Sequence, residues 1–103
     1  MAIKRALIVT PDPAHALTFN VVVREGAGES RHRVSVSSGD AARHASGGVE
    51  AEQCVEAAMA FLLDREPKES ILPAFDIAVI RRYFPEFDEV FPAYLERARA
   101  RRA

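Results

Sequence analysis

The residues best suited to chemistry are three histidines and one cysteine, and their spacing does not form a recognisable site. His15, His32 and His44 are never four positions from one another or from Cys54, as paired metal ligands on one helical face would be. Cys54 falls on or beside the apolar face of an expected helix, where a buried thiol is chemically inert. No nucleophile, base and orienting group can be assembled from residues so scattered. The sequence therefore predicts no catalytic residue, no metal site and no cofactor.

Arginines on a strand-like segment are the candidate nucleic-acid contacts. In "SRHRVSVSS", Arg31, Arg33 and Ser35 alternate with residues of the opposite face, and a two-stranded ribbon can enter the major groove with such a face. This pattern favours a nucleic-acid-binding regulator of antitoxin type as an alternative function. The charge distribution counts against it, because residues 49–96 hold four basic and eleven acidic side chains, a balance of −7.

Two features of "FLLDREPKESILPAFDIAVIRRYFPEF" could belong to a site, namely its charged residues and its aromatic residues. The charges between Asp64 and Glu69 are more typical of a solvated set of weak ion pairs. Seven of the eight aromatic residues lie between residues 61 and 94, and their helical spacing indicates a packing face. We expect more aromatic surface than a three-stranded sheet and one helix can cover. The surplus is expected to form a homodimer contact through Phe87, Phe91 and Tyr94.

The elements that must position these residues divide the chain into a strand half and a helical half. Residues 3–10, 16–24 and 31–37 are rich in β-branched residues or alternate with period two, which predicts three strands. Because short segments connect them, we expect an antiparallel meander.

Helical spacing predicts a helix over residues 50–64 that covers one face of the sheet. Asp40 and Asp76 are candidate caps for short helices over 41–45 and 77–84, and a last helix begins near Pro85 or Pro92. The chain is thus expected to be a single α+β domain, with residues 96–103 as a mobile basic tail. The expected core contains Phe19, Val21, Val34, Val55, Met59, Leu62, Ile80 and Phe84. Truncation of Phe84 to alanine is expected to cost about 3–5 kcal/mol.

Part of the helical half resembles a segment known from other proteins. Residues 49–91, with "REPKES" at 65–70 and "YFPE" at 83–86, are similar to a C-terminal segment of small bacterial proteins described only as hypothetical. The resemblance implies a free-standing bacterial protein, and it implies no activity. A lone cysteine fits a reducing cytoplasm, and the chain lacks the run of about 18 apolar residues that a membrane span needs.

Three functions remain open on these grounds. The leading hypothesis is a non-enzymatic interaction or binding protein that forms a homodimer or binds another protein. The nucleic-acid-binding regulator is the second. The third is a small enzyme whose site is built across a subunit interface.

Overall fold

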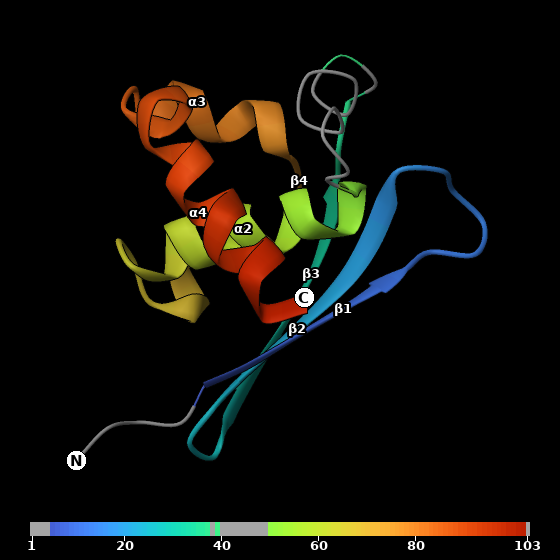
Figure 1. Cartoon of the computed structure of the whole chain (residues 1–103). Helices are drawn as coiled ribbons and strands as arrows, with labels where there is room; N and C mark the ends of the chain where they lie inside the picture. The colour runs from blue at the N-terminus through green and yellow to red at the C-terminus, as the bar shows by residue number, and fades with distance from the viewer. Residues whose placement is uncertain (1–4, 38, 40–49, 103) are drawn as a thin grey trace.

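The computed structural model describes residues 5–37, 39 and 50–102 (Figure 1), so the helix expected over 41–45 lies outside the described residues. An α+β fold is confirmed. The elements follow one another as β1 (Arg5–Pro11), β2 (Thr18–Glu25), β3 (Gly28–Ser35), α2 (Ala51–Leu63), the 3₁₀ turn η1 (Lys68–Ser70), β4 (Ala74–Asp76), the 3₁₀ turn η2 (Ile77–Val79), α3 (Ile80–Tyr83) and α4 (Phe87–Arg102).

The sheet contains the expected antiparallel meander and one strand more. Its order is β1-β2-β3-β4, with β4 parallel to β3. The expectation of three antiparallel strands is therefore corrected to a mixed sheet of four. The fourth strand was missed because it has only three residues, too few to display a period-two pattern. Hydrogen bonds from the N–H of Arg33 to the carbonyl of Pro73 (2.7 Å) and from Ser35 Oγ to Asp76 Oδ2 (2.8 Å) hold it in place.

A two-residue turn joins β2 to β3. Gly26 occupies its first position with φ of 61°, a left-handed conformation that glycine adopts without a steric penalty. Glycine at this position is typical of the tight turns that match the twist of a hairpin. The pairing of Glu25 with Gly28 fixes the register of the whole meander.

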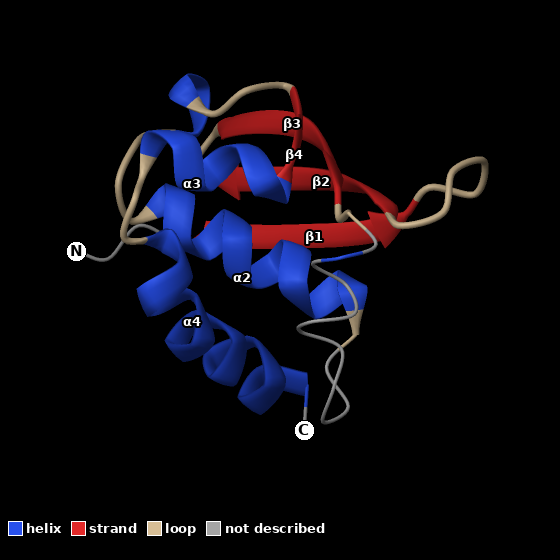
Figure 2. Ribbon diagram, turned by 90° about the horizontal axis from the view of Figure 1, so that it is seen from above, coloured by secondary structure: helices blue, strands red, loops and turns tan. Residues whose placement is uncertain are grey.

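The helices lie on one face of the sheet in two layers. Figure 2 shows α2 beside the sheet and α4 on the side of α2 that faces away from it. Seven of the eight expected core residues are buried between these layers, and Phe84 is only partly buried against them. The opposite face of the sheet carries Ile8, Val22 and polar side chains and is not covered by any described helix.

The carboxyl-terminal segment is helical where a mobile tail was expected. Helix α4 continues to Arg102, and Leu95 and Ala98 are 7% and 0% exposed. These side chains, one turn apart, bury the inner face of α4, which explains why the helix does not end near residue 96. Pro92 lies within this helix and does not end it.

None of the helices formed by the described residues combines the length and the apolar character needed to cross a membrane.

Candidate binding groove

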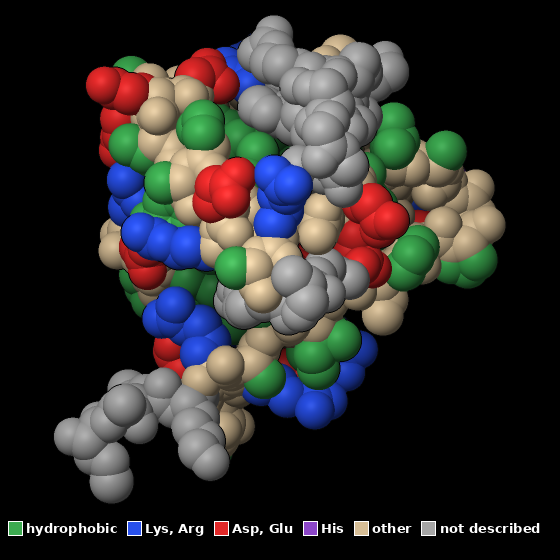
Figure 3. Space-filling view, in the orientation of Figure 1, with side chains coloured by type: hydrophobic (Ala, Val, Ile, Leu, Met, Phe, Trp, Pro, Cys, Tyr) green, Lys and Arg blue, Asp and Glu red, His purple; other side chains and the backbone are tan. Residues whose placement is uncertain are grey.

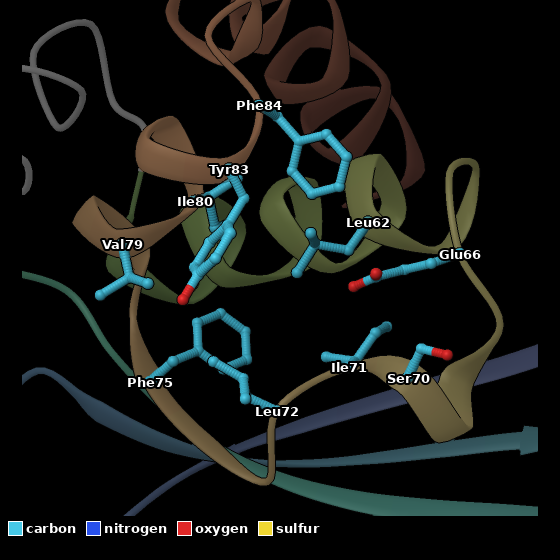
Figure 4. Close-up of a pocket in the computed structure, with 10 residues that line it drawn as sticks. All are labelled: Leu62, Glu66, Ser70, Ile71, Leu72, Phe75, Val79, Ile80, Tyr83 and Phe84. Carbon is cyan, nitrogen blue, oxygen red and sulfur yellow. The ribbon is translucent and has the colours of Figure 1, made fainter.

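The helical half of the chain forms a mostly apolar groove that is open to solvent on one side (Figure 4). Its volume is about 430 Å³, within the range of pockets that hold small ligands or side chains of a partner. All of its lining residues come from one continuous stretch of the chain: Leu62, Glu66, Ser70, Ile71, Leu72, Phe75, Val79, Ile80, Tyr83 and Phe84.

Successive short elements build the walls of this groove. The last turn of α2 supplies Leu62, and Pro67 then starts the turn that leads to Ile71 and Leu72. Strand β4 supplies Phe75, and α3 returns over the opening with Tyr83. Proline and the short 3₁₀ turns keep the segment from forming one long helix, so apolar side chains converge from several directions instead of forming one stripe.

A buried histidine fastens one wall to the sheet. His32 is 5% exposed on β3. Its Nδ1 lies 2.8 Å from the carbonyl oxygen of Leu72, and its Nε2 lies 2.8 Å from Ser30 Oγ. Because a carbonyl oxygen only accepts hydrogen bonds, Nδ1 carries a proton and donates it. His32 thus has a structural role that its spacing in the sequence did not reveal.

Two large apolar side chains at the groove are open to solvent. Leu72 is 48% exposed and Tyr83 is 69% exposed. The third exposed large apolar residue among those described, Ile8 (39%), lies on the uncovered face of the sheet. Leu72 and Tyr83 thus border the same apolar cavity.

Among the described residues that line the groove, Glu66 alone has a charged side chain. It follows α2 by three residues, and Figure 4 shows its carboxylate pointing into the cavity between Leu62 and Ile71. In the sequence, Glu66 was interpreted as one member of a solvated set of ion pairs. Glu66 comes four residues after Leu62, and this helical spacing indicates that both side chains face the groove.

An aromatic cluster supports the groove from behind. The ring of Phe61 makes edge-on contacts with Phe84, Phe87 and Tyr94 at centroid distances of 5.6, 5.0 and 5.7 Å. Phe87 and Phe91 are 0% and 1% exposed within the single chain. They therefore have no surface to offer a second chain, and the interface assigned to them from sequence is corrected. Both rings are needed to fill the space between α2 and α4.

Tyr94, the third residue of that expected interface, is partly buried. Its hydroxyl donates a hydrogen bond to Asp64 Oδ2 (2.5 Å), and Arg65 Nη1 lies 3.4 Å from the same hydroxyl. Arg65 also stacks over the ring of Phe61 at 3.6 Å and pairs with Glu86 at 3.2 Å. These contacts connect the end of α2 to α4 next to the ring of Tyr94.

The candidate nucleic-acid contacts lie on the uncovered face of the sheet, and acidic partners accompany them. Arg31 pairs with Glu29 at 3.1 Å, and Arg33 pairs with Asp12 at 3.1 Å. A hydrogen bond from Arg24 and a weaker one from Arg31 lower the pKa of Glu29, so this carboxylate stays charged. The hydroxyl of Ser35 is directed to Asp76, as described above. The guanidinium charges are thus compensated within the chain, which leaves little basic potential for phosphate.

Acidic and basic side chains are also interspersed on the face shown in Figure 3. Of the residue types best suited to metal or nucleophile chemistry, Cys54 is 1% exposed and His15 lies 2.8 Å from Arg33, while His44 is outside the described residues. Within the described ranges no three potential metal ligands gather.

Searches against protein-family models, curated proteins and solved structures found no match to this chain. The resemblance of residues 49–91 to hypothetical bacterial proteins stays a prediction.

Proposed function

We propose that this protein is a non-enzymatic interaction module that binds an apolar segment of a partner polypeptide in the groove between residues 62 and 84. The observation that carries the proposal is the concentration of exposed apolar surface at Leu72 and Tyr83 beside a cavity of about 430 Å³. An apolar side chain of the partner would fill the cavity against Phe75 and Ile80. Burial of one leucine side chain stabilises a complex by about 1.5–3 kcal/mol.

The supporting walls favour a preformed groove. His32 holds the backbone of Leu72, and the Phe61 cluster holds Phe84. A groove with fixed walls costs less conformational entropy when a ligand binds. The partner is proposed to be a polypeptide because extended segments place alternate side chains where such grooves can take them.

The cellular setting is proposed on separate grounds. The single cysteine is buried and the chain can form no internal disulfide, which supports a reducing cytoplasm. The resemblance of residues 49–91 supports a bacterial protein. A homodimer is a proposal that competes for the same surface, because Leu72 and Tyr83 would then be covered by a second copy.

Nuclear magnetic resonance titration tests the groove directly. Terminally blocked peptides Ac-Ala-Ala-Leu-Ala-Ala-NH₂ and the same peptide with alanine for leucine are added to the ¹⁵N-labelled protein. We expect the leucine peptide to shift the amide signals of Ile71, Leu72 and Tyr83, and the alanine peptide to shift them far less. Leu72→Ser should weaken binding about five- to tenfold, which corresponds to about 1–1.4 kcal/mol.

The matched control is Ile8→Ser, which removes a similarly exposed apolar side chain from the opposite face of the sheet. This variant should bind the leucine peptide as the unmodified protein does. The proposal fails if saturating leucine peptide leaves the groove signals unchanged, or if Ile8→Ser and Leu72→Ser weaken binding equally.

A further inference from the structure

Among the residues that the structure describes, none provides a counter-ion for Glu66, which lies in an apolar setting. Its side chain is partly buried and points into the groove. Among the described residues no hydrogen-bond donor or basic side chain contacts its carboxylate; the nearby ion pairs involve Glu69 and Glu86 instead. A carboxylate that is partly withdrawn from water and has no partner is unfavourable. A ligand that brings a cation to this position would relieve that cost.

The basic residues next to Glu66 in sequence are engaged elsewhere. Arg65 pairs with Glu86 and stacks on Phe61. The Lys68 ammonium pairs with Glu69, and its side chain is 9% exposed because it packs against the β2–β3 hairpin at Gly28. Neither cation therefore neutralises Glu66, and the groove retains one uncompensated negative charge.

The end of α2 adds to the negative potential at this position. The helix ends at Leu63, and the N–H of Glu66 donates to the carbonyl oxygen of Leu62 at 2.9 Å. The last carbonyl groups of a helix carry a partial negative charge, which favours cations and disfavours carboxylates. Arg65 Nη1 already donates to one of these groups, the carbonyl oxygen of Phe61, at 3.2 Å, so a ligand cation at the groove would be attracted mainly by Glu66.

We propose that Glu66 determines specificity in the groove by selecting a partner segment in which an apolar residue lies within two positions of a lysine or arginine. The inference rests on the proposed function. The apolar side chain of the partner occupies the cavity near Phe75 and Tyr83, and its basic group forms an ion pair with Glu66. The two contacts together distinguish a cationic apolar segment from an apolar segment of any other charge.

A panel of blocked peptides tests this selection. Each contains one leucine among alanines and one lysine placed one or two positions before or after it. For each, a companion carries Nε-acetyl-lysine, which keeps the length of the side chain and removes its charge. We expect at least one lysine peptide to bind about five- to tenfold more tightly than its acetylated companion, because a charge-assisted hydrogen bond at a partly buried position is stronger than a neutral one. The ratio should decrease between 50 and 500 mM NaCl.

Glu66→Gln keeps the shape of the side chain and removes its charge. In this variant the ratio between lysine and acetyl-lysine peptides should fall to about one. Glu89→Gln is the matched control, because Glu89 is an exposed carboxylate on α4 that does not line the groove. It should preserve the ratio. Circular dichroism and the urea midpoint confirm that both variants are folded, and the salt dependence of the unmodified protein provides a test that needs no variant.

The outcomes separate this inference from the proposed function. If no leucine peptide shifts the groove signals, the proposed function itself fails. If leucine peptides bind in the groove but lysine and acetyl-lysine peptides bind equally, the groove stands and the role of Glu66 is overturned. If the groove signals of the protein alone shift with its concentration and Glu66→Gln abolishes that shift, the cation belongs to a second copy, and the proposal of a separate partner is overturned.

Discussion

Replacement of Phe87 by alanine should destabilise the protein far more than replacement of Phe84, although the two residues are only three positions apart. Phe87 is fully buried, with ring centroids of Phe61 and Phe91 at 5.0 and 4.6 Å. Phe84 is partly buried and contacts Phe61 at 5.6 Å. Complete burial places Phe87→Ala in the range of about 3–5 kcal/mol. Partial burial reduces the expected cost of Phe84→Ala to about 1–3 kcal/mol, below the about 3–5 kcal/mol expected from sequence.

Urea denaturation followed by circular dichroism measures both values. The free energy of unfolding of a small domain falls by about 1–3 kcal/mol per molar urea, so a loss of about 3–5 kcal/mol in Phe87→Ala should lower the midpoint by about 1–5 M. The experiment is repeated at a tenfold higher protein concentration. A midpoint that does not change with concentration identifies the lost contacts as contacts within one chain.

Two results would refute this account of the aromatic cluster. A loss below about 1 kcal/mol for Phe87→Ala would show that its ring is not part of the core, since core truncations of phenylalanine cost more than this. A concentration-dependent midpoint that Phe87→Ala abolishes would restore Phe87 to a subunit interface. Phe84→Ala should in addition weaken the binding of the leucine peptide, because its ring is a wall of the groove.

Three further perturbations test other parts of the structure. Gly26→Val should lower the free energy of unfolding by about 1–2 kcal/mol, because valine is strained at φ of 61°, and Gly26→Asn should cost less than half as much in the same urea titration. His32→Leu leaves the Leu72 carbonyl without its donor and should cost about 1–3 kcal/mol, with faster amide exchange in β4 as the specific sign. The stability that four carboxyl groups contribute should be fully present above about pH 5.5 and be lost as the pH falls further, since the unfolded state then binds more protons; equal urea midpoints at pH 6 and pH 3 would contradict this. The carboxyl groups responsible have pKa values lowered by hydrogen bonds from backbone N–H groups or basic side chains: Asp12, Glu29, Glu69 and Glu86.

The sheet and α2 could be predicted because their patterns are long and their contacts are local. The alternation from Thr18 to Glu25 and the helical spacing from Ala51 to Leu63 each extend over several repeats. Strand β4 contains only Ala74–Asp76, and its hydrogen-bonding partner is distant in sequence. Its formation depends on tertiary pairing, which no local pattern reveals.

The groove could be predicted only in part. The crowding of apolar residues between 61 and 87 was evident, but the sequence did not show which of them fill the core. Phe87 and Tyr83 are both large and aromatic, yet one is fully buried and the other is 69% exposed. The difference depends on the angle between α3 and α4 that follows Pro85, and that angle is set by packing against α2. The sequence also does not separate Glu66 from its charged neighbours. Arg65 and Lys68 form ion pairs in the folded chain, whereas no described residue pairs with Glu66.

The parallel pairing of β3 with β4 has a consequence for the order in which the chain folds. The joined residues Ser35 and Asp76 are 41 positions apart, whereas a two-residue turn connects β2 to β3. Closing the longer loop costs more conformational entropy and is expected to be slower. The meander of β1, β2 and β3 can therefore form first. The groove is complete only when β4, which supplies Phe75, pairs with β3.

A region that docks last through three residue pairs is also expected to open most easily. A ligand that binds only the closed groove stabilises this docked state by mass action, more strongly as its concentration rises above its dissociation constant. Amide exchange in β4 would then slow when the groove is occupied, while exchange in β1 and β2 would change less. The rate of amide exchange in β4, the strand that the sequence does not predict, should therefore report whether a partner is bound.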